Sequence, residues 1–296
     1  MNPVTTAIIP VAGLGTRVLP ASKAIPKEML PIVDKPAIQY VVEEAVAAGI
    51  KTIILVTRSG KEAIENHFDS NYELESLLKQ KGKTKVLEEV TNLVPQGVEV
   101  VSIRQDAPKG LGHAVLCARH FCQNGAFAVL LPDVLVFRNG DETDLAEMVK
   151  QYEKSGAGQI MVEAVPEDKV QMYGIADCDG SSPEPYASVN IKGMVEKPSV
   201  EEAPSNLAVV GRYILPAQTM EILKKTPPGA GNEVQLTDAL EELLNFQNLQ
   251  AYRMGGTTFD CGNKLGYLLA NVHMGMQHPE TSEGFSEALQ TMFEAK

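Results

Sequence analysis

A glycine loop followed by basic side chains lies near the amino terminus and could bind a phosphate group. Residues 12–17 read AGLGTR, and Lys27 follows ten residues after Arg17. Glycines let the backbone approach a phosphate closely, with its amide N–H groups turned toward the anion. Arg17 and Lys27 add positive charge beside this loop, as the transfer of a phosphoryl or nucleotidyl group requires. Because tight turns explain most isolated glycine loops, the combination with Lys27 is the stronger signal.

Two established phosphate-binding motifs do not fit this loop. A dinucleotide-binding fingerprint would need a third glycine at position 18, which is Val18. Its ribose-binding acid would fall about 20 residues further on, and Asp34 there lies among prolines instead of at the end of a strand. A P-loop would need Gly-Lys-Ser/Thr after a four-residue gap, and this is absent. A nicotinamide-dependent dehydrogenase is therefore excluded by the loop.

One aspartate follows an apolar run in a way that suggests a ligand site. Asp133 comes directly after residues 127–132, which read FAVLLP. The carboxyl ends of central parallel strands are where ligands bind in such sheets, although a turn or helix-capping aspartate is also common there. The five histidines are scattered, and the pair His113 and Cys117 is interpreted as packing because no further ligand is in register.

The elements that would position these residues alternate between strand and helix. Residues 6–11 predict a buried strand, residues 37–49 a helix closed by Gly49, and residues 52–56 a second strand. This is a βαβ unit, so we expect a Rossmann-like, mostly parallel sheet flanked by helices. A charged stretch at 69–97 predicts a helical insert. Further strands are expected at 98–103, 127–131, 159–165, 191–195, 207–215 and 249–254, and further helices at 112–118, 144–154, 235–245, 264–276 and 283–293.

Composition places the chain among ordinary globular proteins. The 296 residues are 44% hydrophobic and 22% charged, and no linker divides them, so a single domain over 1–296 is expected. A net charge of −12 argues against a nucleic-acid partner. The stretch from Arg17 to Lys35 is nonetheless net positive, although a chance fluctuation on a solvated face remains open. No signal peptide or membrane span is expected, and four cysteines without a CxxC pair indicate a reduced, cytoplasmic protein.

With these motifs in order, the sequence resembles the sugar nucleotidyltransferase (nucleotide-sugar pyrophosphorylase) family. The segment AGLGTRVLPASKAIPKEMLPIVDKP is similar to the signature of its bacterial UTP–glucose-1-phosphate uridylyltransferase branch. Blocks reading YELESLL, RQDAPKGLGHAVLCA, FAVLLPDVL, MYGI, MVEKP and FDCGNKLGYLLA continue the likeness along nearly the whole chain. The resemblance implies that UTP and glucose 1-phosphate react to give UDP-glucose and pyrophosphate without a covalent enzyme intermediate. Catalysis would then consist of positioning and charge neutralisation.

The resemblance also implies roles for individual residues. Arg17 and Lys27 would be catalytic and bind the triphosphate, and Asp133 and Asp260 would hold Mg²⁺, an ion suited to oxygen ligands. The nucleotide would contact Ala12, Gly13, Gly15, Gln105 and Gly110, and the sugar phosphate would contact Gly174, Glu196 and Lys197. Homologous enzymes form dimers or tetramers, so a homodimer or homotetramer is expected.

Two alternatives share the family. A non-catalytic regulatory paralogue would lose loop residues, whereas Thr16, Arg17, Lys27, Asp133, Lys197 and Asp260 are all present here. A thymidylyltransferase using dTTP differs by one methyl group on the base, which is worth only about 1–3 kcal/mol of discrimination. The KAIPKEMLPI and YELESLL blocks favour the uridylyl branch.

Overall fold

The amino-terminal part of the computed structural model is built on parallel strands; the structure describes residues 3–123, 125–140 and 142–294. Four strands run in one direction in the order β6-β1-β4-β5. They are β1 (Thr6–Pro10), β4 (Thr52–Thr57), β5 (Glu99–Arg104) and β6 (Phe127–Leu130). The central residues of β1 are fully buried because helices cover both faces of the sheet. The predicted βαβ unit is confirmed.

The sheet continues past β6 through strands of both directions. The full order is β10-β13-β8-β12-β6-β1-β4-β5, and β12 runs antiparallel to both β6 and β8. Of these eight strands, only β10 and β12 oppose the rest, so the prediction of a mostly parallel sheet is confirmed. The bounds are β8 (Gly158–Ala164), β10 (Ser188–Asn190), β12 (Leu207–Leu215) and β13 (Leu249–Arg253), with β9 (Gly174–Asp177) and β11 (Gly193–Glu196) forming an antiparallel pair beside β12.

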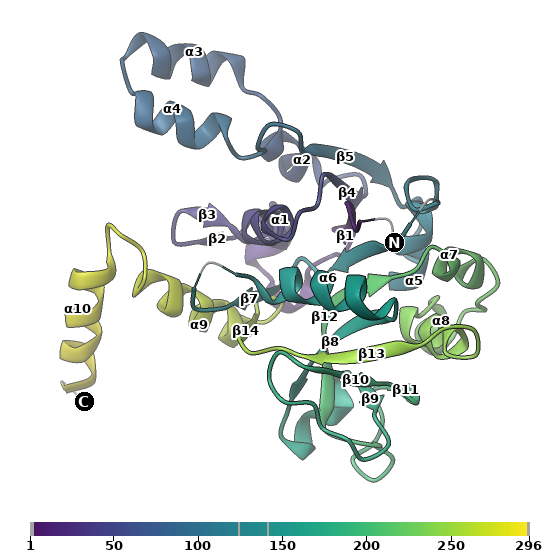
Figure 1. Cartoon of the computed structure of the whole chain (residues 1–296). Coiled ribbons are helices and arrows are strands. Elements are labelled where there is room, and N and C mark those ends of the chain that lie inside the picture. Colours follow the sequence, from purple (N-terminus) through teal and green to yellow (C-terminus); the bar gives the residue numbers. More distant parts are fainter. Residues whose placement is uncertain (1–2, 124, 141, 295–296) are drawn as a thin grey trace.

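Helices cover the two faces of the sheet (Figure 1). The two larger hydrophobic clusters lie between the sheet and these helices, and a third, smaller cluster surrounds β9. Alternate residues of β1 belong to different clusters, with Ile9 in one and Ile8 in the other. The first cluster includes buried residues of α1 (Ala37–Ala47) and α6 (Asp144–Ser155). The second includes residues of α5 (Leu111–Cys117), α7 (Gln218–Leu223) and α8 (Leu236–Leu243). The architecture is therefore three-layered, with the sheet between two helical layers.

Two helical additions extend from this core, as the sequence predicts (Figure 1). The insert consists of α3 (Tyr72–Gln80) and α4 (Thr84–Thr91), which follow α2 (Glu62–Phe68). The carboxyl end consists of α9 (Lys264–Gly275) and α10 (Ser282–Glu294). Among the described residues, no helix is long and apolar enough to span a membrane. All four cysteines carry free thiols.

Several short elements were not predicted from the sequence. The most important is a separate antiparallel pair of β7 (Val134–Phe137) and β14 (Thr257–Asp260). A second small pair is β2 (Pro31–Ile32) with β3 (Lys35–Pro36). Short 3₁₀ turns occupy Thr16–Val18, Ala21–Lys23, Lys27–Met29, Arg119–Phe121, Glu167–Met172 and Ala230–Asn232. Runs of two to six residues are too short to show a hydrophobic periodicity.

Candidate active site

The glycine loop leaves β1 and turns back tightly against the segment that carries Lys27. Gly15 has a φ of 69°, in the left-handed region that glycine adopts without strain. A Cβ atom at this position would lie 3.2 Å from Cβ of Lys27. Ser22 Oγ donates a 2.7 Å hydrogen bond to the carbonyl oxygen of Gly15 and fixes the turn. The glycine loop therefore lies close against the Lys27 side chain and leaves no room for a further side chain between them.

The two basic side chains of this region converge on one aspartate. Lys27 Nζ donates a 2.5 Å hydrogen bond to Oδ2 of Asp133, and both side chains are largely buried. Arg17 Nη2 lies 3.4 Å from the same oxygen, while its own side chain is 60% exposed. Burial alone would raise the pKa of Asp133. The attraction and hydrogen bond of Lys27, together with the charge of Arg17, outweigh it and lower that pKa. Asp133 is thus a carboxylate held between two cations.

The second predicted aspartate joins this cluster from the other end of the chain. Arg17 Nη1 lies 3.5 Å from Oδ2 of Asp260, the last residue of β14. The backbone N–H of Cys261 donates to the carbonyl oxygen of Asp133 at 2.7 Å, and that of Gly262 donates to Asp260 Oδ1 at 2.8 Å. A Cβ atom on Gly262 would lie 2.7 Å from Asp133 Oδ2 and 2.8 Å from Asp260 Oδ1. A side chain at this position would push the carboxylates from their present places, so the glycine lets the backbone lie directly against both of them.

The donor set of this cluster fits a magnesium ion shared with a substrate. Asp133 and Asp260 supply oxygen ligands, and a cation between two carboxylates would replace the charge now supplied by Arg17 and Lys27. No group of three or more acidic, histidine or cysteine residues that could hold a metal occurs in the described part of the chain. Mg²⁺ commonly binds through one or two carboxylates and completes its octahedron with waters and substrate phosphates. Two carboxylates are therefore sufficient for such an ion.

A buried arginine that the sequence analysis missed holds the segment around Asp133. Arg212 of β12 is fully buried, and its guanidinium donates to the carbonyl oxygens of Leu131 at 3.1 Å and Val134 at 2.7 Å. Its charge is balanced by Glu44 of α1, whose Oε2 lies 2.7 Å from Nη2. Both carbonyl groups flank Asp133, so Arg212 fixes the backbone that presents the carboxylate. The signal in the sequence was a charged residue inside the apolar run LAVVGRYIL.

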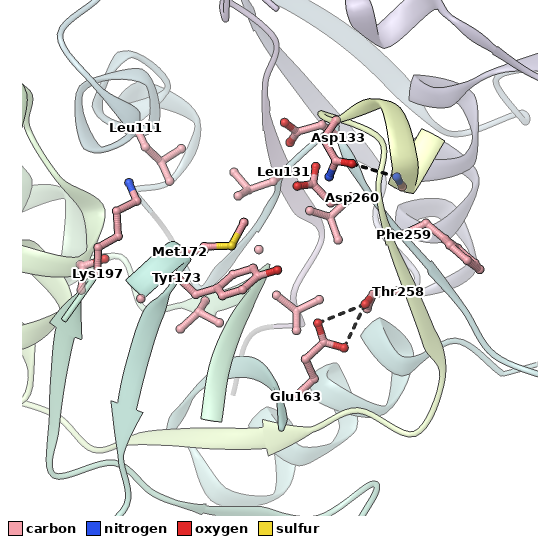
Figure 2. A pocket seen from close by; sticks show the side chains of 18 of the residues that line it. Leu111, Leu131, Asp133, Glu163, Met172, Tyr173, Lys197, Thr258, Phe259 and Asp260 are labelled. Carbon is pink, nitrogen blue, oxygen red and sulfur yellow. Dashed lines mark hydrogen bonds between the residues drawn. The ribbon is translucent and has the colours of Figure 1, made fainter. Parts of the chain in front are cut away.

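A cavity of about 580 Å³ adjoins the cluster and brings in the predicted sugar-phosphate residues. Its lining includes Arg17, Asp133 and Asp260 together with Gly174, Glu196 and Lys197. Figure 2 shows Lys197 on one side of this space and the two aspartates on another. The cavity therefore joins residues from β7, β9, β11 and β14 that lie far apart in the sequence.

The sugar-phosphate residues are positioned by the antiparallel pair β9 and β11. Gly174 pairs with Glu196, and a Cβ atom on Gly174 would lie 3.2 Å from Oε2 of that glutamate. The hydroxyl of Thr237 donates a 2.7 Å hydrogen bond to the same oxygen. Lys197 has a φ of 46°, a left-handed conformation that costs a non-glycine residue energy, and its Nζ lies 3.2 Å from Glu196 Oε1. Strain of this kind clusters at functional sites.

Three further residues on the cavity wall were not found from the sequence. The carboxylate of Glu163, at the end of β8, accepts hydrogen bonds from Thr258 Oγ1 at 3.1 and 2.9 Å. Burial raises the pKa of Glu163, and the hydrogen bond from Thr258 offsets this in part. Tyr173 lies between these two residues and Lys197 in Figure 2. Burial, followed by the charges of Glu163 and Asp260, raises the pKa of Tyr173. The sequence offered little indication of a functional role for these three residues, because each occupies an ordinary polar position in a short segment.

Two of the five predicted nucleotide-binding residues, Ala12 and Gln105, line a second hollow at the ends of β1 and β5, whereas Gly13, Gly15 and Gly110 are not part of its lining. Ala12 and Gln105 line a cavity of about 380 Å³, together with Arg58 and Arg104. Gln105 Nε2 donates to the carbonyl oxygen of Gly110 at 3.1 Å and lies 3.0 Å from His113 Nδ1. These contacts hold the loop from Gln105 to Gly110 in place. His113, which the sequence analysis interpreted as a packing residue, is therefore also a polar partner of Gln105.

Gly110 joins this loop to a distant segment of the chain. It has a φ of 95°, and a Cβ atom there would lie 2.7 Å from Cβ of Glu233 and 2.8 Å from the carbonyl oxygen of Val234. The backbone N–H groups of Gly112 and Val234 donate across the junction, to the carbonyl oxygens of Val234 at 2.8 Å and Lys109 at 2.7 Å. Glycine is required here, and Gly110 itself lies against protein in this structure.

Comparison with known proteins gives matches along nearly the whole chain. Residues 6–276 match the family model described as nucleotidyl transferase. A UTP–glucose-1-phosphate uridylyltransferase of Haemophilus influenzae is 52% identical over 289 residues, which is 97% of this chain and 98% of that protein. The enzyme of the same name from Escherichia coli is 52% identical over 93% of this chain and 91% of its own length.

Solved structures agree with these sequence matches. A UTP-bound UGPase from Acinetobacter baumannii superposes with a TM-score of 0.92 at 54% identity, covering 97% of this chain and 99% of that one. A UDP-glucose pyrophosphorylase complexed with UDP-glucose superposes with a TM-score of 0.83 at 39% identity, covering 93% of this chain and 100% of that one. A putative glucose-1-phosphate thymidylyltransferase from Bacillus anthracis, at 21% identity and a TM-score of 0.69, shares the fold.

Proposed function

The chain belongs to the nucleotidyl transferase family, and from this we propose that it transfers a uridylyl group from UTP to glucose 1-phosphate. The products are UDP-glucose and pyrophosphate. The observation that carries the proposal is the convergence of Arg17, Lys27, Asp133 and Asp260 beside the cavity lined by Lys197. Such a cluster can neutralise a triphosphate next to a second phosphate. The two relatives at 52% identity are named uridylyltransferases, which favours this enzyme over a regulatory paralogue or a thymidylyltransferase.

The reaction requires charge neutralisation and alignment without a covalent intermediate. A phosphate oxygen of glucose 1-phosphate attacks the α-phosphorus of UTP, a new P–O bond forms, and the bond to the β-phosphate oxygen breaks as pyrophosphate leaves in line. Arg17 and Lys27 neutralise the charge that builds on the α-phosphate and on the leaving group. Lys27 now donates to Asp133, so it exchanges this carboxylate for a phosphate oxygen when the nucleotide binds. Asp133 and Asp260 would hold Mg²⁺, which would supply further positive charge to the phosphates.

The acceptor substrate occupies the 580 Å³ cavity in this proposal. The compact ammonium group of Lys197 binds its phosphate while leaving an oxygen free to attack. Glu196, oriented by Thr237, accepts hydrogen bonds from sugar hydroxyls, and Gly174 offers its backbone at close range. The strained backbone of Lys197 fits this role because it directs the side chain from the end of β11.

The base of the nucleotide occupies the 380 Å³ hollow in the same proposal. The amide of Gln105 has a donor and an acceptor, which match the O4/N3 edge of uracil. Ala12, Gly13 and Gly15 bring backbone close to the nucleotide, and Gly110 braces Gln105 through its carbonyl oxygen. Because a methyl group is worth only about 1–3 kcal/mol, slow turnover of dTTP is compatible with this site.

A pyrophosphate-release assay tests the proposed function. The purified full chain is incubated with UTP, glucose 1-phosphate and Mg²⁺, and UDP-glucose is measured in parallel. We expect both products in equal amounts, and a lower kcat/KM with dTTP than with UTP. Absence of UDP-glucose at micromolar enzyme would refute the enzymatic proposal and favour the regulatory paralogue.

We also propose a single domain over residues 1–296, a cytoplasmic location and a homodimer or homotetramer. One sheet joins both hydrophobic clusters, which supports a single domain. Four free thiols support a reducing compartment. Large apolar side chains are exposed on the carboxyl-terminal helices, and covering them would favour self-association: Leu265, Leu268, Leu269, Met292 and Phe293. Light scattering coupled to gel filtration measures the oligomeric state, and a monomer at assay concentration would contradict the proposed homodimer or homotetramer.

A further inference from the structure

One carboxylate on the wall of the 580 Å³ cavity has no role in the reaction described above. It belongs to Glu163, near the carboxyl end of β8. Figure 2 shows Tyr173 between Glu163 and Lys197, so this carboxylate lies apart from the cation expected to bind the sugar phosphate. Neutralising the charge of the reacting phosphates therefore gives no role to Glu163.

The hydrogen-bonding capacity of Glu163 is only partly used within the protein. Its two oxygens share a single donor, the hydroxyl of Thr258 at 3.1 and 2.9 Å, whereas an ionised carboxylate can accept about four hydrogen bonds. Among the described residues, no lysine, arginine or histidine lies within 4.0 Å of this carboxylate. A half-buried carboxylate with one protein donor must complete its hydrogen bonds with water or with a ligand in the cavity. The open capacity of Glu163 faces a cavity of substrate size.

The charge of this group restricts the kind of ligand that it can bind. A carboxylate repels a phosphate and attracts neutral hydrogen-bond donors, such as sugar hydroxyls. Arg17 and Lys197, on other parts of the same wall, provide the positive charge that a phosphate needs. A sugar phosphate would therefore bind with its phosphate toward those cations and a hydroxyl group toward Glu163.

We propose that Glu163, oriented by the hydroxyl of Thr258, accepts a hydrogen bond from a hydroxyl group of the glucosyl unit and selects for sugar phosphates that carry it. This inference rests on the proposed function and extends it to a second carboxylate beside Glu196. It gives the cavity two acceptors for hydroxyls on different strands, β8 and β11. Two acceptors on separate strands fix the orientation of a sugar ring better than one.

A purely structural role for Glu163 makes different predictions. Its partner Thr258 lies two residues before Asp260 on β14, so the hydrogen bond could simply fasten the strand that presents the aspartate. In that case Thr258→Val would impair the enzyme as much as any change at Glu163, and the KM for UTP would rise with the KM for glucose 1-phosphate. A sugar-binding role affects glucose 1-phosphate alone.

The decisive experiment compares glucose 1-phosphate with its 2-, 3-, 4- and 6-deoxy analogues in wild-type enzyme, Glu163→Leu and Thr258→Val. We expect wild type to lose about 10- to 100-fold in kcat/KM with one analogue, as for a lost hydrogen bond to a charged group. In Glu163→Leu this particular ratio should fall to near one, while the ratios for the other analogues stay as in wild type. Thr258→Val should keep most of the wild-type discrimination between glucose 1-phosphate and this analogue. The KM for UTP should differ from the wild-type value by less than about threefold in both variants.

Equal discrimination in wild type and Glu163→Leu against every analogue would overturn the inference. If Glu163→Leu does not fold, Glu163→Gln can replace it, because it keeps the shape of the side chain and one acceptor oxygen. The ratio of kcat/KM values for Glu163→Gln should then lie between the wild-type ratio and one. A crystal structure of the unaltered chain with UDP-glucose gives an independent answer. A hydroxyl oxygen within about 3.2 Å of a Glu163 oxygen is expected, and a longer distance to every hydroxyl would overturn the inference. If wild type makes no UDP-glucose at all, the proposed function fails, whereas an active wild type without this coupling refutes the role of Glu163 alone.

Discussion

Replacing Lys27 with alanine should damage catalysis far more than folding. Lys27 Nζ lies 2.5 Å from Asp133 Oδ2, and the two side chains are 13% and 16% exposed. Without it, Arg17 at 3.4 Å remains beside the carboxylate, so we expect the free energy of unfolding to fall by about 1–3 kcal/mol, the worth of one charged hydrogen bond. We expect kcat to fall about 10²- to 10³-fold, equivalent to about 2.7–4 kcal/mol, as when one preorganised donor to a transition state is removed.

The assay measures pyrophosphate release at saturating substrates and urea unfolding on the same preparations. Lys192→Ala serves as the control, because its Nζ pairs with Asp179 at 2.8 Å on an exposed surface away from the cavity. This variant should retain the kcat and the urea midpoint of wild type, because an exposed ion pair contributes little to stability. A kcat for Lys27→Ala within about threefold of wild type would refute the assignment of charge neutralisation to this lysine.

The stability difference between wild type and Lys27→Ala should depend on pH in one direction. Burial opposes ionisation of Asp133, but Lys27 and Arg17 outweigh it and lower the pKa of this carboxyl group. A carboxyl group whose pKa is lower in the folded state stabilises the fold above its unfolded pKa, about 3.9, and loses this contribution as the pH falls. The difference should therefore be full at pH 7 and shrink below about pH 4. A constant difference from pH 7 to pH 3 would contradict this explanation.

Three further changes test the structure around the site. Arg212→Met removes the donors that hold both sides of Asp133 and leaves a buried glutamate, so urea unfolding should show a loss of about 3–5 kcal/mol; a loss below 1 kcal/mol would contradict this. Gly262→Ala places a Cβ atom 2.7 Å from Asp133 Oδ2 and should reduce kcat, whereas Gly284→Ala, with open space around it, should not. Equal activities would show that the charged side chains can shift without loss of function. Burial raises the pKa of Glu163, so its contribution to stability is lost as the pH rises above about 4.3, the pKa in the unfolded chain. Glu163→Gln should therefore unfold at a higher temperature than wild type at pH 7 but not at pH 4. A higher unfolding temperature at both pH values would contradict this explanation.

The sequence predicted the layers of the fold because they follow from local patterns. Buried apolar runs and helical periodicity located β1, α1, β4 and β12 to within one or two residues. They could not reveal that β12 lies antiparallel between β6 and β8, because direction depends on how distant strands pair. The pair β7 and β14 was missed for the same reason, since neither strand is long enough to show a period.

Only those residues of the candidate site that belong to recognisable sequence motifs could be predicted. The glycine loop, Lys27 and the end of β6 are local signals, and family likeness added Asp260 from 127 residues away. The structure places these residues together, although the roles given to them remain predictions. Arg212 and Glu163 could not be found in this way, because one acts through backbone carbonyl groups and the other through a partner on a different strand. Such roles depend on contacts between segments that no short pattern records.

A crystal structure of the chain with UDP-glucose and Mn²⁺, located by its anomalous signal, tests the central claim most directly. We expect one metal peak within coordinating distance of an oxygen of both Asp133 and Asp260, and Lys27 Nζ on a phosphate oxygen instead of on Asp133. A metal bound elsewhere, with Lys27 still paired to Asp133 beside the bound nucleotide sugar, would contradict the account of how this cluster works.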